Sequence, residues 1–435
     1  MGKRGSQRKN SALLDREDDE DDSFGSARSD RSGYLRSSGA DMVELNRDDM
    51  LDHAVDALYE KRGSTREKAL AAIIEGFKSH VQIEFVEKQS ATLLHQCLSS
   101  VKRVSVREIA LASHVIGLLA LTVGCGANAN EIFEESLPPI SQALKSGIEV
   151  SKTAALLECL AIVRFVGGND PKEKEKSMQL MWQLIRPKLG PNVVAVKPSP
   201  ALISAVVTAW AFVLTSIDGN SCDPKQWQET VSHLSTLLDK DNRSVRIAAG
   251  EALAVIFEMG RLDKFSSADD GPCEFSHIQG LKRKVVDQIR DLSMEAGGKG
   301  TVKKDLNNQR NLFRNILAYV EDGCSPQTSI KIGGETLSTS TWSQLIQLNF
   351  LKRFLGGGFV KHVQDNEFVQ DVVGFTPKRA QLSDIDSLLS SSEKRLYKSP
   401  NSALSKARTQ HLNKQRLMSQ SRNSGRFAVG AEEDC

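Results

Sequence analysis

Apolar and small residues recur at helical spacing in one stretch near the middle of the chain. Residues 241–260 read "DNRSVRIAAGEALAVIFEMG". After a charged turn, Val245, Ala249 and Leu253 fall on one face of a helix, because positions three or four apart share a side. An alanine on that face lets a neighbouring helix approach closely, and the larger residues fill the remaining space. The pattern predicts one helix from the interior of a stack.

The same pattern recurs along the chain. Arg66, Arg107 and Arg246 each stand three residues before an alanine, and two further apolar runs keep the alanine alone. The five alanines are Ala69, Ala110, Ala154, Ala205 and Ala249. They are 41, 44, 51 and 44 residues apart, and HEAT and armadillo repeats have a period of about 40–47 residues. The sequence therefore predicts an all-α fold, a HEAT/armadillo-like α-solenoid.

Amphipathic segments between these copies predict the second helix of each repeat. They cover residues 84–101, 131–146, 173–189 and 225–240. The arginines of the pattern are expected to be structural, with Arg246 bonding an acid or a carbonyl of the adjacent turn and Asp241 as the candidate acid. A solenoid of this kind offers an extended surface that suits binding to another protein.

The pattern changes after the last copy and divides the chain into four parts. We expect residues 1–42 to be a disordered tail, basic and then acidic, and residues 43–322 to be the helical repeats. Residues 323–393 form a small, mainly helical C-terminal region, in which β-branched residues and glycines at residues 329–342 predict a short hairpin. Residues 394–435 form a basic tail.

One uncharged run allows two interpretations. Residues 198–217 contain no charged side chain and approach the length that a membrane-spanning helix requires. The run carries Ser204, Thr208, Thr215 and Ser216, and no second span accompanies it. These features favour a fully buried solenoid helix over a membrane span.

The chain lacks the common motifs of catalysis and cofactor binding. It has no GxxxxGK[ST], HExxH or GxSxG sequence, and its eight histidines are scattered without metal-ligand spacing. We therefore expect no enzyme activity, no catalytic residue, no cofactor, no metal and no small-molecule substrate. The seven cysteines include no CxxC pair, which favours a reducing compartment such as the cytosol or nucleus.

The two ends of the chain carry opposite charge. Residues 15–22 hold seven acids in eight positions, and residues 394–426 hold nine Lys or Arg and no acid. An acid-free basic segment is typical of proteins that bind phosphate-bearing partners such as RNA. Pairing with the acidic block and a purely solvated tail are the alternatives. The candidate nucleic-acid or ribosome contacts are Lys394, Arg395, Lys398, Lys406, Arg408, Lys414 and Arg416.

Three residues match modification patterns. Thr376 and Ser399 each precede a proline and are candidate phosphorylation sites. Phosphate at Ser399 would add roughly −1.5 to −2 charges beside Lys398 and weaken phosphate contacts nearby. Gly2 fits a minimal myristoylation pattern, for which a nuclear-import patch or a solvated tail are alternatives.

Three motifs in the C-terminal part carry a resemblance to a known family. They are "LGGG" at residues 355–358, "NEF" at residues 366–368 and "LYKS…KART" at residues 396–409. A HEAT-like stack followed by these motifs resembles the interferon-related developmental regulator family over about residues 43–418. The acidic N-terminus and the last residues differ, and we take them as features of a separate branch, expected to be a plant one.

The resemblance implies a non-enzymatic regulator of gene expression in the nucleus and cytoplasm, acting in growth or stress responses. Members of the family look like transcriptional coregulators that bind transcription and chromatin proteins, so a solenoid adaptor is the leading hypothesis. Some members also sit on idle ribosomes, with the basic C-terminal segment in the channel for tRNA and messenger RNA. That segment corresponds here to residues 394–416, so the alternative hypothesis is a ribosome-associated, RNA-binding repressor of translation.

Overall fold

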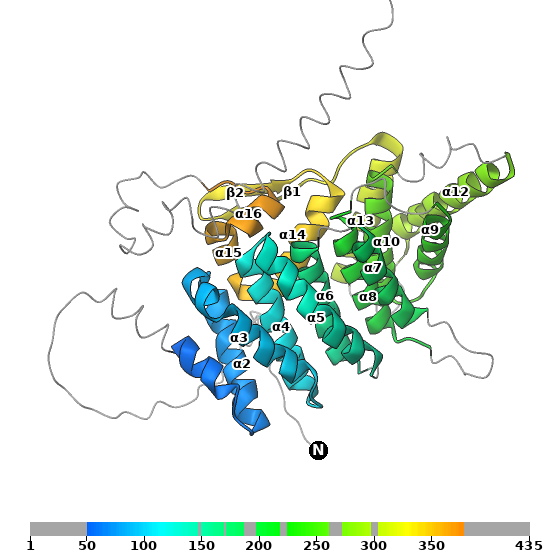
Figure 1. The fold of residues 1–435 in the computed structure, drawn as a ribbon. Helices are drawn as coiled ribbons and strands as arrows, with labels where there is room; N and C mark the ends of the chain where they lie inside the picture. Colours follow the sequence, from blue (N-terminus) through cyan, green and yellow to red (C-terminus); the bar gives the residue numbers. More distant parts are fainter. Residues whose placement is uncertain are drawn as a thin grey trace, which may run out of the picture. The chain divides into compact units, whose positions relative to one another are not determined.

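The fold is a stack of helices that follow one another along the chain (Figure 1). The computed structural model describes residues 50–146, 149–168, 171–186, 197–217, 224–260, 272–296 and 303–377. All of them belong to one unit of mutually contacting residues. Residues 50–57 are helical, and the helices after them pack pair upon pair. The predicted all-α solenoid is confirmed, and it carries one two-stranded hairpin.

Alternate helices form two rows. The inner row consists of α2 (Gly63–Ser79), α4 (Val106–Val123), α6 (Val150–Gly167), α8 (Pro200–Leu214), α10 (Arg243–Glu258) and α13 (Lys303–Asp322). The outer row consists of α3 (Ile83–Val101), α5 (Ala127–Lys145), α7 (Pro171–Ile185), α9 (Pro224–Leu238) and α12 (Pro272–Met294). Each inner helix contacts the next inner helix, and from α4 onward it also packs on the outer helix before it. The segments predicted as second helices of the repeats are α3, α5, α7 and α9.

Polar side chains cap the start of four inner helices, α4, α6, α8 and α10. Ser105, Ser199 and Asn242 each accept a hydrogen bond from the amide three residues later. Such a cap satisfies one of the donors that a helix start leaves unpaired. Glu149 caps α6 in a similar way. The N-cap residues of α2, α4, α6, α8 and α10 recur at intervals of 43, 44, 50 and 43 residues, close to the predicted period.

The predicted register of alanines is correct at both ends of the series and wrong between them. Counted from their N-caps, Ala69 and Ala249 occupy the same position and are buried. The buried residues at that position in α4, α6 and α8 are Ala112, Leu156 and Val206. The alanines predicted there are the partly exposed Ala110, Ala154 and Ala205. The cap fixes the phase of a helix, whereas alanine fits any of its faces.

Helices α4 and α8 are the most apolar of the inner row. Within the described ranges one helix, α4, is long and apolar enough to cross a bilayer, and 67% of that stretch is buried inside the stack. Helix α8, which holds most of the uncharged run, is shorter. It packs against α6, α7 and α10, and most of its residues are buried. Burial among neighbouring helices accounts for the apolar character of both.

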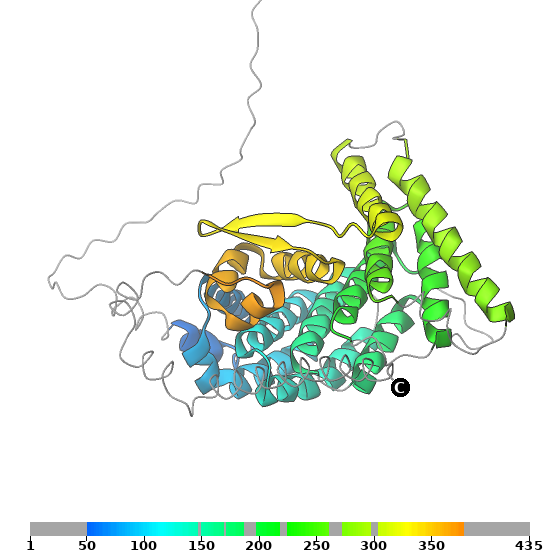
Figure 2. The same ribbon diagram turned by 90° about the horizontal axis from the view of Figure 1, so that it is seen from above.

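After α13 the chain forms a layer against the inner row (Figure 2). We call residues 328–375 the C-terminal layer. Strands β1 (Thr328–Ile332) and β2 (Glu335–Thr339) form the predicted antiparallel hairpin. Gly333 and Gly334 join them with φ of 55° and 87°, values that a two-residue hairpin turn needs and glycine adopts without strain. Helices α14 (Trp342–Leu355), η1 (Gly356–Gly358), α15 (Phe359–Asp365) and α16 (Glu367–Val373) complete the layer.

Candidate functional site

Backbone contacts fasten the C-terminal layer to the first repeats. Gly358 lies directly on α2, where an added Cβ would stand 2.8 Å from a backbone carbonyl oxygen. The Nε2 atom of buried His362 is 2.9 Å from the Phe77 carbonyl oxygen, and Asn366 Nδ2 donates to the Leu121 carbonyl oxygen at 2.9 Å. These bonds satisfy carbonyl groups near the ends of α2 and α4, which have no partner within their helices. The "LGGG" and "NEF" motifs thus hold the layer in place.

Aromatic rings fasten the middle of the layer. The ring of Phe354 lies over Gly117 of α4 and packs against the ring of His114, with centroids 4.4 Å apart. Phe350 stacks on Phe212 of α8 at a centroid distance of 4.0 Å. Buried aromatic pairs of this kind contribute about 0.5–1.5 kcal/mol beyond their area. The rings therefore pack α14 on the inner row, and under Phe354 the contact leaves no room for a Cβ on Gly117.

A charged cap fastens the far end of the layer. The Glu258 carboxylate, at the end of α10, accepts hydrogen bonds from the amides of Trp342 and Ser343 at 2.6 and 2.8 Å. An anion at a helix N-terminus is favourable, because the unpaired amides there carry partial positive charge. The layer is therefore held along the inner row from α2 to α10. From α2 to α10, therefore, the C-terminal layer covers part of the solenoid surface that was expected to bind another protein.

A polar pocket of about 270 Å³ lies at the margin of the layer, between α8, α10 and α14. We call it the margin pocket. It is lined by Ser204, Thr208, Ser244, Ile247, Ala248, Glu251, Ile346, Asn349, Phe350 and Arg353. Two of these side chains are charged, four carry a hydroxyl or amide group, and four are apolar. The pocket is thus a small polar site where the repeats meet the C-terminal layer.

The carboxyl group of Glu251 dominates the electrostatics of the margin pocket. The side chain is partly buried, and burial raises its pKa to about 7, against the opposing charge of Arg353. Among the residues that the structure describes, no hydrogen bond or ion pair holds this carboxylate. Near neutral pH the group is therefore close to half ionised, and its oxygens are open to a ligand.

The guanidinium of Arg353 is already engaged. Its Nε is 3.2 Å from Glu158 Oε1 of α6, and its Cζ lies 4.9 Å from the ring centroid of Phe350. Stacking on an aromatic face and pairing with a carboxylate hold a guanidinium in a fixed position. Once Glu251 ionises, the pocket region carries two carboxylates and one guanidinium, which is already paired with Glu158. The ionised pocket therefore favours a cationic ligand over an anion.

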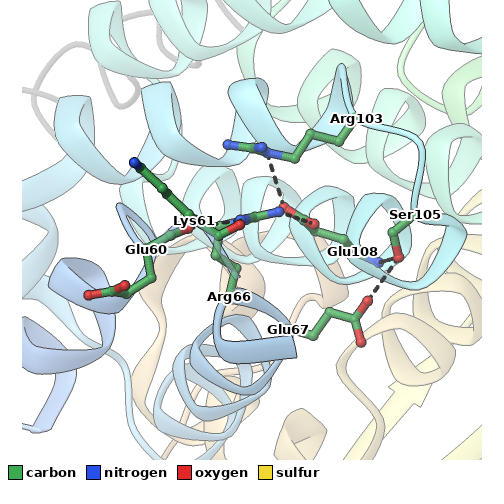
Figure 3. A network of polar contacts seen from close by, with 7 residues as sticks. All are labelled: Glu60, Lys61, Arg66, Glu67, Arg103, Ser105 and Glu108. Carbon is green, nitrogen blue, oxygen red and sulfur yellow. Dashed lines mark hydrogen bonds and ion pairs between the residues drawn. The ribbon is translucent and has the colours of Figure 1, made fainter. Parts of the chain in front are cut away.

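A buried ion pair links the first two inner helices (Figure 3). Arg66 donates from Nε and Nη2 to the two carboxylate oxygens of Glu108, each at 2.8 Å. It also donates to the carbonyl oxygens of Glu60 and Lys61. Burial alone would raise the pKa of Glu108, but the hydrogen bond and charge of Arg66 hold it below its usual value. A paired and fully bonded charge can be buried, so this network is structural.

The other two arginines of the repeated pattern differ from each other. Arg246 donates to the Lys240 carbonyl oxygen, as predicted for the adjacent turn, but its acidic partner is Glu295 at 2.9 Å and not the predicted Asp241. The partner comes from the next repeat, as it does for Arg66, because the start of one inner helix faces the next pair in the stack. Arg107 is mostly exposed, and its ion pair is looser, with Nε 3.7 Å from a carboxylate oxygen of Glu67. It therefore belongs to a different face of its helix.

A second hollow, of about 420 Å³, lies on the outer row. Arg186, Gln228, Glu229, Ser232, His233 and Thr236 line it. Burial lowers the pKa of His233 to about 4, assisted by the charge of Arg186, so the ring is neutral at physiological pH. Among the described side chains no cluster of His, Cys, Asp or Glu is arranged to hold a metal ion. The margin pocket, with its open carboxylate, is the stronger candidate for binding.

The predicted site residues lie mostly beyond the described ranges. Lys394, Arg395, Lys398, Lys406, Arg408, Lys414, Arg416 and Ser399 all fall outside them. Thr376 is described and exposed, directly after buried Phe375 at the end of the C-terminal layer. Its phosphorylation stays a prediction, as do the nucleic-acid contacts.

Sequence reasoning did not find the residues of the margin pocket. Glu251, Asn349 and Arg353 come from helices that are about a hundred residues apart in the chain, and no local spacing connects them. One signal was present: Glu251 follows Gly250 within an otherwise small and apolar helix face. A carboxylate among such residues is unusual, because burying it without a partner is costly.

Comparison with known proteins places these features in one family. The profile described as "Interferon-related developmental regulator (IFRD)" matches residues 22–321. A second profile, "Interferon-related protein conserved region", matches residues 366–420, which include α16. The first match covers more than half of the chain, and the second begins at the "NEF" motif that holds the layer on α4.

Curated relatives match over most of their length. "Interferon-related developmental regulator 2" of Mus musculus is 28% identical over 374 residues, covering 84% of this chain and 81% of the relative. "Interferon-related developmental regulator 1" of Sus scrofa is 28% identical over 366 residues, covering 82% and 77%. A solved chain from "Structural Basis of Microtubule Plus End Tracking by XMAP215, CLIP-170 and EB1" is 18% identical, covers 53% of this chain and 89% of that one, and has a TM-score of 0.34. That score is too low to support any argument from likeness.

Proposed function

The chain belongs to the interferon-related developmental regulator family, and we propose that it is a non-enzymatic adaptor that regulates gene expression by binding transcription or chromatin proteins. It would act in the nucleus and cytoplasm, in growth or stress responses. The relatives are named developmental regulators. The proposal builds on this general regulatory role.

One observation supports the adaptor function above the rest: the C-terminal layer is fastened to the inner row from α2 to α10. Carbonyl bonds, stacked rings and a charged cap hold it there. A solenoid presents an extended, rigid surface on which many side chains can contact another protein. The layer adds a second set of side chains to that surface, with the margin pocket at the junction. Such a surface suits recognition of a protein better than conversion of a small substrate.

A tethering experiment tests this proposal. The full chain, fused to a DNA-binding domain, is directed to a promoter upstream of a reporter gene, and reporter messenger RNA is measured. We expect the tethered chain to change transcription and Gly358→Ala to abolish the change, because its Cβ would stand 2.8 Å from the carbonyl oxygen of Lys78 and push the layer off α2.

Gly357→Ala is the matched control, since a Cβ at Gly357 meets no atom within 4 Å. It should regulate the reporter like the parent chain. Circular dichroism of both variants establishes that the helices remain. A tethered parent chain without effect on transcription would contradict the adaptor function.

A second candidate is a ribosome-associated, RNA-binding repressor of translation. It is favoured by the nine Lys or Arg and absence of acids in residues 394–426. The profile that matches residues 366–420 also includes most of this segment together with α16. A segment of this charge is attracted to phosphates regardless of sequence, and salt weakens the attraction by restoring counterions.

Sucrose-gradient sedimentation distinguishes the two candidates. The translational repressor should comigrate with ribosomes at low salt and leave them as salt rises, whereas the adaptor should stay in light fractions at both. Replacing Lys406, Arg408, Lys414 and Arg416 by Glu should abolish comigration and leave the helical circular-dichroism signal unchanged. Comigration that survives both high salt and the four substitutions would contradict the second candidate.

A further inference from the structure

The margin pocket offers oxygen acceptors from three helices to one small ligand group. The Glu251 carboxylate comes from α10, the hydroxyls of Ser204 and Thr208 from α8, and the amide of Asn349 from α14. No described residue forms a hydrogen bond or ion pair with that carboxylate. An ammonium group has three donors and no acceptor, and therefore matches a pocket whose walls on three helices carry oxygen acceptors.

We infer that the margin pocket binds the side chain of a lysine from a partner protein, with its ammonium group beside the Glu251 carboxylate. The inference rests on the proposed adaptor function, for which it names one contact with the partner. The bound lysine contacts the repeats and the C-terminal layer at once.

Size and lining distinguish lysine from other ligands. The volume of about 270 Å³ accommodates a four-carbon stem, and Ile247 and Ile346 provide apolar surface for it. The place of a guanidinium is already taken, because Arg353 stacks on Phe350 and pairs with Glu158. The Phe350 ring already stacks on Phe212 as well as on Arg353, so it is not free to stack on a second planar cation.

The charged side chains that line the margin pocket, and the partner that one of them has, come from three helices. Helix α10 contributes Glu251 to the pocket, α8 contributes uncharged side chains, and α14 contributes Arg353. From α6, Glu158 faces Arg353 and compensates it. When Glu251 ionises, the net charge of the site is therefore negative, which favours a cation. The ammonium group also supplies hydrogen bonds in place of the water that burial has removed from the carboxylate.

Proton release follows from this arrangement. The pKa of Glu251 is about 7 in the free pocket, and a bound cation lowers it. Lysine stays protonated throughout this range, so Glu251 alone loses its proton on binding. Between pH 6 and pH 8 the ionised fraction rises from about one tenth to about nine tenths, and affinity for lysine should rise about tenfold.

The test uses the full chain and short blocked peptides. Each peptide has five residues: the central one is lysine, acetyl-lysine or arginine, and the four flanking residues are Gly or Ser. Binding is followed by ligand-observed NMR, and proton release by calorimetry in two buffers of different ionisation enthalpy. We expect the lysine peptide to bind more tightly than the other two, to release protons at pH 7 and to gain about tenfold in affinity from pH 6 to 8.

Two matched substitutions locate the effect. Glu251→Gln keeps the shape of the side chain but removes its charge, and should abolish both the binding and its pH dependence. Glu135→Gln makes the same change on an exposed position of outer helix α5 and should leave binding as in the parent. Both variants keep the charged ends of the chain, so any unspecific attraction is equal. Equal binding by Glu251→Gln, or tighter binding of the arginine peptide, would overturn the inference.

The outcome separates this inference from the proposed function. Lysine binding that depends on Glu251, in a chain that does not regulate the tethered reporter, supports the pocket and contradicts the adaptor function. If the tethered chain regulates the reporter but Glu251→Gln leaves binding of the lysine peptide unchanged, the result contradicts lysine binding in the pocket and leaves the adaptor function in place.

Discussion

Replacing Gly117 by alanine is a sharp test of how α14 packs on the inner row. Gly117 lies within α4, and an added Cβ would stand 2.5 Å from Phe354 Cζ and 3.2 and 3.3 Å from two further ring atoms. The ring cannot retreat easily, because Phe354 is 3% exposed and packs against His114 on one side. A glycine in a helix is here the residue that lets two elements touch.

Two opposing effects determine the magnitude. Alanine in place of glycine within a helix normally stabilises by about 0.5–1 kcal/mol, because it restricts the unfolded chain. Forcing a methyl group into a packed core costs about 1–3 kcal/mol. The clash at 2.5 Å exceeds what a small shift can relieve, so we expect a net loss of about 1–2 kcal/mol for Gly117→Ala.

Urea unfolding followed by circular dichroism measures this difference. Gly280→Ala on α12 is the matched control, since a Cβ there meets nothing within 4 Å, and it should gain about 0.5–1 kcal/mol. Adding Phe354→Leu to Gly117→Ala should recover part of the loss by making room, which a double-mutant cycle detects. Gly117→Ala as stabilising as Gly280→Ala would refute the packing described for α14.

Three further changes test other parts of the structure. Glu108→Gln should destabilise the chain by about 3 kcal/mol in chemical denaturation, because it leaves the buried guanidinium of Arg66 without its anion. A loss below about 0.5 kcal/mol, which is typical of exposed ion pairs, would contradict the burial of this pair. Ala249→Leu should cost about 1–3 kcal/mol by overpacking and Ala110→Leu much less, and equal melting temperatures of the two variants would refute the corrected register. Burial, with the charge of Lys78, lowers the pKa of His114 to about 4, so between pH 6.5 and pH 4 the unfolded state takes up a proton that the buried ring does not. His114 should therefore cost the parent chain up to about 3 kcal/mol of stability at pH 4 relative to pH 7. Unfolding midpoints measured against pH should show this loss in the parent relative to His114→Gln, and a difference between the two that does not change with pH would contradict the assignment.

Local patterns were sufficient for the solenoid and for the hairpin. Apolar residues at helical spacing depend on one face being buried, and the repeat interval depends on pair packing on pair, so both are visible in the sequence. The hairpin was visible because Gly333 and Gly334 stand between two β-branched runs. The register failed at Ala110 because an alanine tolerates every face, whereas Ser105, which caps the helix, determines its phase.

The docking of the C-terminal layer could not be derived in this way. Asn366 and the Leu121 carbonyl oxygen are 245 residues apart in the chain, and a single sequence carries no mark of such a pair. The one available sign was Gly117 within a strongly apolar helix, which indicates close approach of another element. For the same reason the margin pocket, built from α8, α10 and α14, became apparent only in the folded chain.

Hydrogen exchange with mass spectrometry tests most directly whether the C-terminal layer is fastened to the inner row. In the parent chain, amides of α14 and α16 should exchange as slowly as those of α4, because all three share one packed interface. Gly358→Ala should speed exchange in α15 and α16 while α9 and α10 stay protected, and Gly357→Ala should change nothing. Exchange of α14–α16 at the rate of an unfolded peptide in the parent chain would contradict the account.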